Sequence, residues 1–206
     1  MTSTSILSDE MTEAARWHLF ARLFERPIPG WHGEVHALAT EMTDPILRAV
    51  AEQATALDEG GYLASLGPGG RVSPREAGHC GWRDPGWVLS DLARYYEAFG
   101  YRPRGEDPLD HVAVEVGFVA YLHLKEALAL ANEDDEGASV TREARDAFVR
   151  EHLATLVVSL SRRLTVEDGH LAAAMDLLAA RVPMGDVSVS SEERPDPLDA
   201  GCNGCG

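Results

Sequence analysis

The sequence predicts an all-α protein built as a single domain, and three observations support this prediction. Apolar residues recur at intervals of three and four along most of the chain, which is the spacing of an amphipathic helix. Period-two alternation, which is typical of a strand, occurs only in Val187–Ser190. At 206 residues and 45% hydrophobic content, the chain is long enough to bury one core. We therefore expect one bundle of seven or eight helices over residues 1–183.

The first predicted helix begins at Ser8, whose hydroxyl suits an N-cap, and runs to Phe24. Proline lacks the backbone donor that a helix interior needs, so Pro27 and Pro29 must follow the end of this helix. Its apolar residues cover much of the circumference, and they are Met11, Ala14, Ala15, Trp17, Leu19, Phe20, Leu23 and Phe24.

Two further helices are predicted before the middle of the chain. The first is short and covers residues 31–40. The pair Asp44-Pro45, a capping residue followed by a proline, predicts the start of the second. We expect Gly60-Gly61 to close this helix. Its apolar stripe is Ile46, Val50, Ala54 and Leu57.

A long loop is predicted over residues 67–86, because helical spacing disappears there and glycine and proline are frequent. Trp82 and Trp87 lie in or beside this loop, where their exposure would be costly unless they pack against the body or a ligand. Helical spacing resumes from Trp87 to Phe99. Gly100 then supplies the left-handed residue that ends a helix.

The pair Asp107-Pro108 predicts the start of the longest helix, over residues 109–132. Acids oppose the dipole at a helix C-terminus, so the acidic run 133–136 is interpreted as a solvated loop after this helix. Another helix is predicted from about Thr141 to Leu160. The Thr165–Asp168 pattern is typical of a capping box, and it precedes a last helix that Pro183 ends.

Residues 184–206 have the composition of an acidic, disordered tail, rich in Ser, Pro, Asp, Glu and Gly. The tail holds Cys202 and Cys205 in a CxxC pattern, which supplies half of a zinc site and is a weak metal candidate. With Cys80, the chain has three cysteines, a number that suits a reducing compartment rather than a disulfide scaffold.

The charge and hydropathy of the chain exclude several classes of protein. The net charge of −16 would repel the phosphates of nucleic acid, so no nucleic-acid partner is expected. No apolar run approaches the length that a membrane span needs, and the N-terminus lacks a basic segment followed by an apolar one. We expect a soluble, cytoplasmic protein without stable membrane insertion.

Candidate functional residues gather near the predicted start of the long helix. Asp110 and His111 form an acid–imidazole pair, and His111 shares one helical face with Glu115, Phe118 and Leu122. Three interpretations remain open: a general base or a metal site that uses His111 and Glu115, structural capping, or a polar recognition site for a peptide or a cofactor. The other helical histidines, which include His123, His152 and His170, are interpreted as residues at the boundary of the core.

Several short motifs resemble the TorD/DmsD/NarJ family. The ending Tyr96–Gly100 and the turn Glu106–His111, followed by Glu115, Phe118 and Leu122, are similar to the central signature of that family. Ser73–Glu76 resembles its S-P-x-E loop, and Phe20–Phe24 with Pro27 resembles its first helix. Two departures are the extra Asp107 within the turn and Arg75 where many members have an aromatic residue. The resemblance covers most of residues 10–180.

The resemblance implies an all-helical cytoplasmic chaperone, without catalytic activity or a cofactor of its own, as a monomer or a helix-swapped dimer. Its client would be the apo catalytic subunit of a molybdopterin oxidoreductase of the dimethyl sulfoxide reductase type. The chaperone would bind the twin-arginine-type N-terminal segment of this subunit until the molybdenum cofactor is inserted. Asp110 and His111 match the motif positions for peptide recognition, so Asp110→Asn or His111→Ala should weaken binding without unfolding. The predicted peptide-binding residues are Asp110, His111, Glu115, Phe118, Leu122 and Trp87. The alternative is a metal-binding or enzymatic helical protein that uses His111, Glu115 and the C-terminal cysteines.

Overall fold

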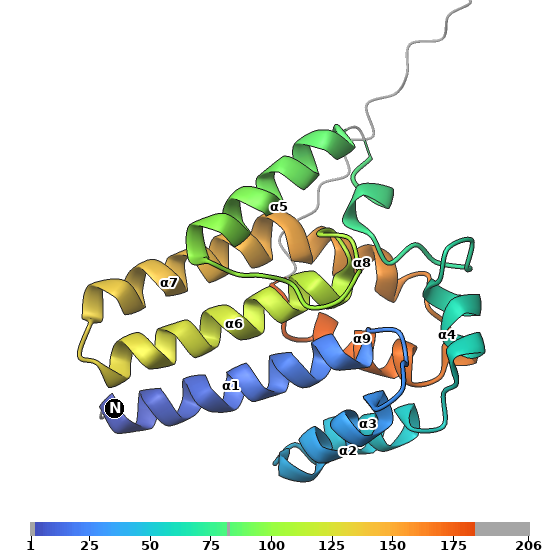
Figure 1. Ribbon diagram of the computed structural model, residues 1–206, viewed down its shortest axis with the longest axis horizontal. Coiled ribbons are helices and arrows are strands. Elements are labelled where there is room, and N and C mark those ends of the chain that lie inside the picture. The colour runs from blue at the N-terminus through green and yellow to red at the C-terminus, as the bar shows by residue number, and fades with distance from the viewer. Residues whose placement is uncertain (1–2, 82, 184–206) are drawn as a thin grey trace, which may run out of the picture.

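The computed structural model describes residues 3–81 and 83–183 of the chain, and these residues fold into helices (Figure 1). Short 3₁₀ turns cover Glu76–Gly78 and Val166–Asp168, and a π turn at Val149–Leu153 joins two helices without a break. Within the described residues, extended pairing is limited to one isolated bridge between Arg75 and His111. The helices are α1 (Ser3–Leu23), α2 (Trp31–Glu41), α3 (Pro45–Ala54), α4 (Glu59–Leu66), α5 (Pro85–Phe99), α6 (Val112–Ala131), α7 (Asp135–Phe148), α8 (Ala154–Ser161) and α9 (His170–Ala179).

The all-α prediction is confirmed. When α7, the π turn and α8 are taken as one continuous rod, the described part of the chain contains eight helical rods, within the predicted seven or eight. The predicted loop between α4 and α5 is also present, and the Glu76–Gly78 turn is its one helical segment. None of the described helices combines the length and the apolar character that a membrane span needs.

The three long rods lie side by side in the order α1, α6, α7, and α6 runs antiparallel to both neighbours (Figure 1). On the other side of the rod that contains α7, α5 packs through Tyr95, whose ring lies 5.3 Å from that of Phe148. At the opposite end, α9 packs against α1, α3 and α8. The bundle therefore has α6 near its centre, with one side facing α7 and the other facing α1.

The core is built around Phe118 of α6, which is completely buried. Its ring centroid lies 4.7 Å from that of Phe148 and 4.9 Å from that of Tyr96, in edge-on arrangements. Burying one such side chain contributes about 1.5–3 kcal/mol. This cluster joins α5, α6 and α7, so it fixes the centre of the bundle.

The first three helices differ from the prediction at particular residues. α1 begins at Ser3, not Ser8, because the longer helix partly buries Ile6 and Leu7. α3 has the predicted Asp44 cap, whose carboxylate accepts the backbone N–H groups of Ile46 and Leu47. The predicted stripe was wrong at Ile46, which is 62% exposed, and Leu47 takes its place in the core.

The prediction that Gly60-Gly61 closes α3 was wrong. This glycine pair lies in the first turn of α4. α3 ends at Ala54, and a new helix begins after Asp58. The Asp58 carboxylate accepts the N–H of Gly61 at 2.7 Å, and this cap starts a helix that the glycines alone would not favour. The spacing of apolar residues missed α4 because it is only eight residues long.

The second half of the chain contains three corrections. α6 begins at Val112 rather than at the Asp107-Pro108 pair, and at 20 residues it is one residue shorter than α1. α7 begins at Asp135, six residues before the predicted start at Thr141. The acidic run is therefore only partly a loop. Its last two residues lie in the first turn of α7, where the helix dipole favours acids.

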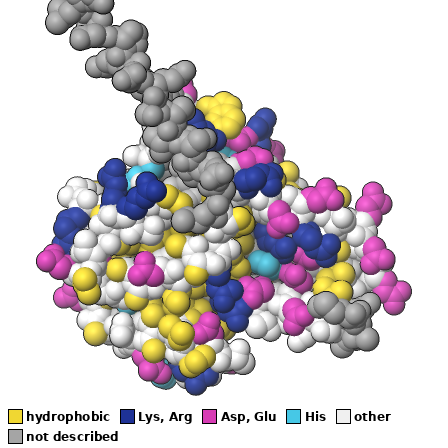
Figure 2. All heavy atoms as spheres, turned by 180° about the vertical axis from the view of Figure 1, so that it is seen from behind, with side chains coloured by type: hydrophobic (Ala, Val, Ile, Leu, Met, Phe, Trp, Pro, Cys, Tyr) yellow, Lys and Arg dark blue, Asp and Glu magenta, His cyan; other side chains and the backbone are white. Residues whose placement is uncertain are grey.

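The capping box at Thr165–Asp168 is confirmed, although α9 begins only at His170. Figure 2 shows the molecule from behind, with acidic side chains gathered toward the side that carries the start of α1 and the α6–α7 turn. The predicted tail, with its CxxC pattern, lies outside the described residues.

Candidate functional site

Asp110 lies just before α6 and is completely buried. Its carboxylate accepts hydrogen bonds from Arg75 Nε at 2.9 Å and from the backbone N–H of Ala77 at 3.2 Å. The backbone adds a further contact, since the N–H of Val112 donates to the carbonyl of Pro74 at 2.9 Å. Asp110 therefore clamps the loop of residues 73–77 against the start of α6.

His111 is the N-cap of α6 and is also buried. Its Nδ1 accepts the N–H of Ala113 at 3.2 Å, so the ring proton is on Nε2, which lies 3.3 Å from the hydroxyl of Tyr62. That hydroxyl donates to the carbonyl of Phe24 at 3.2 Å. Burial lowers the pKa of His111 below its ordinary value, which agrees with a neutral ring. This hydrogen-bond geometry corresponds to structural capping, one of the three interpretations that the sequence left open.

Glu115 is completely buried, and neither of its carboxyl oxygens has a hydrogen-bond partner among the described residues. Burial raises its pKa well above the ordinary value, and the nearby acids Glu76 and Asp110 raise it further. Both influences favour the protonated, neutral form of Glu115. Phe118 and Leu122, the other members of the predicted face, are also completely buried.

The sixth predicted residue, Trp87, lies elsewhere. It is 51% exposed in the first turn of α5, and the guanidinium of Arg83 stacks on its ring at 4.9 Å. The structure therefore brings Asp110, His111 and Glu115 together inside the bundle and leaves Trp87 on the surface. A direct contact of these residues with a peptide stays a prediction.

Replacing Glu115 with glutamine should make stability less dependent on pH. Above its unfolded pKa of about 4.5, the unfolded chain releases the Glu115 proton while the folded chain keeps it. The free energy of unfolding of the wild type therefore falls as the pH rises through that window. Glutamine removes this contribution. Urea denaturation from pH 5 to pH 8 should therefore show a smaller fall in the free energy of unfolding for Glu115→Gln than for the wild type. Equal slopes would contradict a neutral, buried Glu115.

His152, which was interpreted as a boundary histidine, is completely buried in the π turn. Its Nδ1 lies 3.0 Å from a carboxylate oxygen of Glu76, and its Nε2 lies 3.1 Å from one of Asp91. The imidazole thus links the loop before α5, α5 itself and the rod that contains α7. Sequence reasoning missed this link because its three residues are far apart in the chain.

One cluster among the described residues has the spacing of metal ligands, and it does not include His111 or Glu115. It consists of Glu10 from α1 with His123 and Glu126 from α6. The guanidinium of Arg145 fills its centre, with Nη1 3.0 Å from His123 Nδ1 and 3.2 Å from Glu10 Oε2. Arg145 therefore takes the place of a cation, and the cluster is an ion-pair network that joins α1, α6 and α7.

An open groove of about 540 Å³ lies between α1 and α6, and we call it the α1–α6 groove. Each helix contributes residues spaced by three and four, so one face of each forms a wall. Leu38 from α2 and residues 101–107 complete it. From α1 come Met11, Ala14, Ala15, His18 and Ala21, just beyond its end comes Glu25, and from α6 come Ala113, Val114, Gly117, Ala120, Tyr121 and Leu124.

The α1–α6 groove is open because many residues of its two helical walls have small side chains. The alanines Ala14, Ala15, Ala113 and Ala120 end at Cβ and leave space above them. Gly117 has a different role, because a Cβ at this position would lie 2.8 Å from the hydroxyl of Tyr101 and 3.7 Å from the Cβ of Ala21, so the missing side chain lets Tyr101 pack closely there. The groove therefore has room for bulky apolar side chains from another molecule.

The two ends of the α1–α6 groove differ in charge. The charged end carries Glu25, Asp107 and Arg104, whereas the apolar end carries Met11 and Leu124, each about half exposed. Arg102 lines the groove next to Tyr101, whose ring packs on that of Tyr121. Burial raises the pKa of Glu25 to about 7, against the influence of Arg22, its ion-pair partner. Asp107 is half-buried and has neither an ion pair nor a side-chain hydrogen bond to any described residue.

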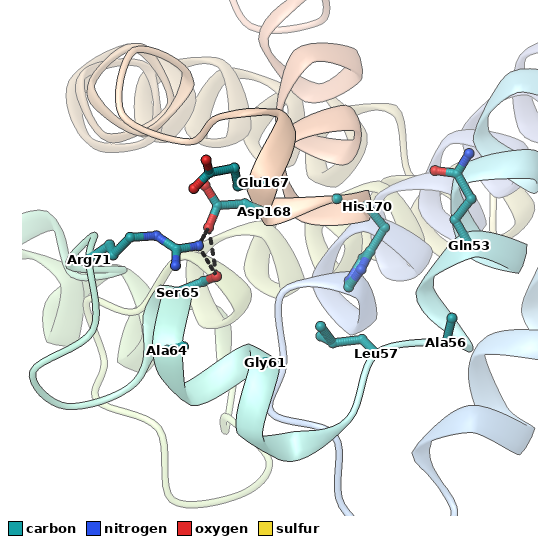
Figure 3. Close-up of a pocket in the computed structure, with 11 residues that line it drawn as sticks. Gln53, Ala56, Leu57, Gly61, Ala64, Ser65, Arg71, Glu167, Asp168 and His170 are labelled. Atoms are coloured by element: carbon teal, nitrogen blue, oxygen red, sulfur yellow. Dashed lines mark hydrogen bonds and ion pairs between the residues drawn. The ribbon is translucent and has the colours of Figure 1, made fainter.

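A second, smaller cavity of about 350 Å³ lies between α3, α4 and the start of α9 (Figure 3). Three of its polar groups are already paired with one another, whereas Nε2 of His170 has no hydrogen-bond partner among the described residues. Ser65 donates to Asp168 at 2.6 Å, and Arg71 binds both. His170 points toward Leu57, and burial lowers its pKa to about 4. The α1–α6 groove is therefore the better candidate for binding a polypeptide.

Comparison with known families gave one match. Residues 72–160 match the family model described as nitrate reductase delta subunit. The matched segment begins in the loop that Asp110 clamps and ends in α8, so it includes the central motifs. A search among curated proteins found no match. The family match confirms the resemblance to the TorD/DmsD/NarJ family.

Proposed function

We propose that this protein is a molybdoenzyme-specific chaperone, since residues 72–160 match the model of the nitrate reductase delta subunit family, which is a family of such chaperones. It binds the twin-arginine-type N-terminal segment of the catalytic subunit in the α1–α6 groove, in the cytoplasm, before the molybdenum cofactor is inserted. In this proposal the protein catalyses no reaction. The observation that carries the proposal is an open, largely apolar groove whose two carboxylates, Glu25 and Asp107, lie at one end.

The chemistry of the groove suits such a segment. A twin-arginine segment presents two guanidinium groups and then an apolar stretch, so its receptor needs carboxylates beside an apolar surface. The α1–α6 groove has Asp107 and Glu25 at one end and apolar walls beyond them. Each large apolar side chain that is buried contributes about 1.5–3 kcal/mol. Four such anchors contribute about 6–12 kcal/mol, and the cost of association must be subtracted, so micromolar affinity, about −8 kcal/mol, requires the ion pairs as well as the apolar contacts.

The buried motif residues act in this proposal by positioning. Asp110 and His111 fix the loop of residues 73–77 and the first turn of α6, from which Ala113 and Val114 reach the groove. Their substitution would weaken binding by moving that turn, without a contact to the peptide. Trp87 lies outside the groove lining, and we retain it as a separate contact for the body of the client subunit.

Chemical-shift mapping tests this proposal. The probe is a synthetic peptide of two arginines followed by twelve alternating leucines and alanines, added to the ¹⁵N-labelled protein. The largest shifts should fall on groove residues such as Ala15, Gly117 and Leu124, because their surroundings change on binding. Shifts confined to residues 73–78 and to Trp87 would instead favour binding at the motif loop and would contradict the proposal.

A further inference from the structure

We infer that the segment in the α1–α6 groove binds with one polarity. Its N-terminal basic residues lie at Asp107 and Glu25, and its apolar residues extend toward Met11 and Leu124. The bound chain then runs parallel to α6 and antiparallel to α1. This inference rests on the proposed function, because it concerns the occupant of the same groove.

Charge is distributed unevenly along the groove. Glu25, Asp107 and Arg104 lie close together where α1 ends and α6 begins. Arg102 follows Tyr101, whose ring lies 5.3 Å from that of Tyr121 further along α6. The other end is formed by Met11 and Leu124, and one turn further along α6 by Leu128, which is 61% exposed. A guanidinium placed there would lose hydration without gaining a partner in the groove wall. A segment with a charged head and an apolar body therefore fits in one direction.

The pairing of the charged residues in the groove favours a bound segment whose charged head is basic. Arg102 and Arg104 are exposed, so water already solvates their guanidinium groups. Asp107 is half-buried and unpaired within the described structure, so an incoming guanidinium supplies a charge-assisted hydrogen bond that it now lacks. Glu25 shares Arg22 with Glu34, so it also has room for a second cation. The charged end thus gains more from a basic head than from an acidic one.

Acids also occur near the apolar end, in the run 133–136 of the α6–α7 turn. They are exposed and do not line the groove. Water and salt screen such charges, and two of them already offset the dipole at the start of α7. They therefore do not reverse the preference that the groove lining sets.

Paramagnetic labels at the two ends test the polarity. Glu106 lies beside Asp107, and Leu128 lies one turn beyond Leu124. A spin label is placed at Glu106→Cys or at Leu128→Cys, in a full-length background in which Cys80, Cys202 and Cys205 are serine. From Val114 to Leu124 the helix rises about 15 Å, so the two labels reach different parts of the bound ¹⁵N-labelled Arg-Arg-Leu/Ala peptide.

We expect the label at residue 106 to broaden the arginine signals and the label at residue 128 to broaden the C-terminal leucine signals. The reverse pattern would overturn the polarity and leave occupancy of the groove intact. Equal broadening of all signals by both labels would overturn a single polarity. If neither label broadened any signal of the bound peptide, the groove itself, and with it the proposed function, would be contradicted.

Charge variants at the same end give an independent readout. Asp107→Asn should weaken binding of the peptide by a factor on the order of three to ten, because one partner of the new ion pair is lost. Arg104→Gln should tighten binding, because it removes a repelling charge. Tighter binding to Asp107→Asn together with weaker binding to Arg104→Gln would show that the head at this end is not basic.

Discussion

Replacing Asp110 with alanine is expected to lower the free energy of unfolding by about 3 kcal/mol. The change removes a fully buried carboxylate and its bonds to Arg75 and to the backbone of Ala77. Removing one partner of a buried ion pair costs about 3–5 kcal/mol. The loss of stability expected for this variant lies at the lower limit of that range. The Arg75 side chain is 43% exposed, so water can hydrate its guanidinium once Asp110 is removed. Urea denaturation at pH 7 measures the difference.

Asp107→Ala is a matched control for this prediction, since it removes a carboxylate from the same turn. Asp107 makes no ion pair with a described residue, so the free energy of unfolding should change by no more than about 0.5 kcal/mol. Equal losses in the two variants would show that Asp110 is not a clamp. The large expected loss for Asp110 also revises the sequence-based expectation that Asp110→Asn spares the fold.

Local signals in the sequence predicted several helix ends correctly. Asp44 caps α3, the Thr165–Asp168 capping box is formed, and Gly100 ends α5 with the expected positive φ of 67°. Such signals act within one turn, so they do not depend on the rest of the fold. The same Asp-Pro signal failed at residues 107–108. There the structure uses His111 as the cap instead, because the N–H of His111 donates to the carbonyl of Pro108 in a turn, and the chain becomes extended only at His111, where it pairs with Arg75.

The candidate site was harder to predict for a physical reason. Helical spacing showed that His111, Glu115 and Phe118 share a face, but a face of this kind looks the same in a core and in a groove. All three are buried in the structure. The groove walls consist largely of alanine and glycine, such as Ala15 and Gly117, which carry little hydropathy signal. Only the antiparallel packing of α1 on α6 brings the two small-residue faces together.

Filling the α1–α6 groove should have the largest effect on client binding. Ala15 is half-buried and lines the groove from α1, so tryptophan at this position would occupy the space that the apolar part of the peptide needs. We expect Ala15→Trp to weaken binding at least thirtyfold, which corresponds to about 2 kcal/mol, the burial of one large side chain. The indole can point into open space, so the melting temperature should change by only a few degrees.

The most direct test of this account is the ratio of two dissociation constants for the Arg-Arg-Leu/Ala peptide, measured by calorimetry. One is for Ala15→Trp, and the other is for Ala37→Trp, which adds the same side chain to an exposed position of α2 outside the groove. The account predicts a ratio of at least thirty, with Ala37→Trp equal to the wild type. Equal affinities for the two variants would contradict the claim that the α1–α6 groove holds the client segment.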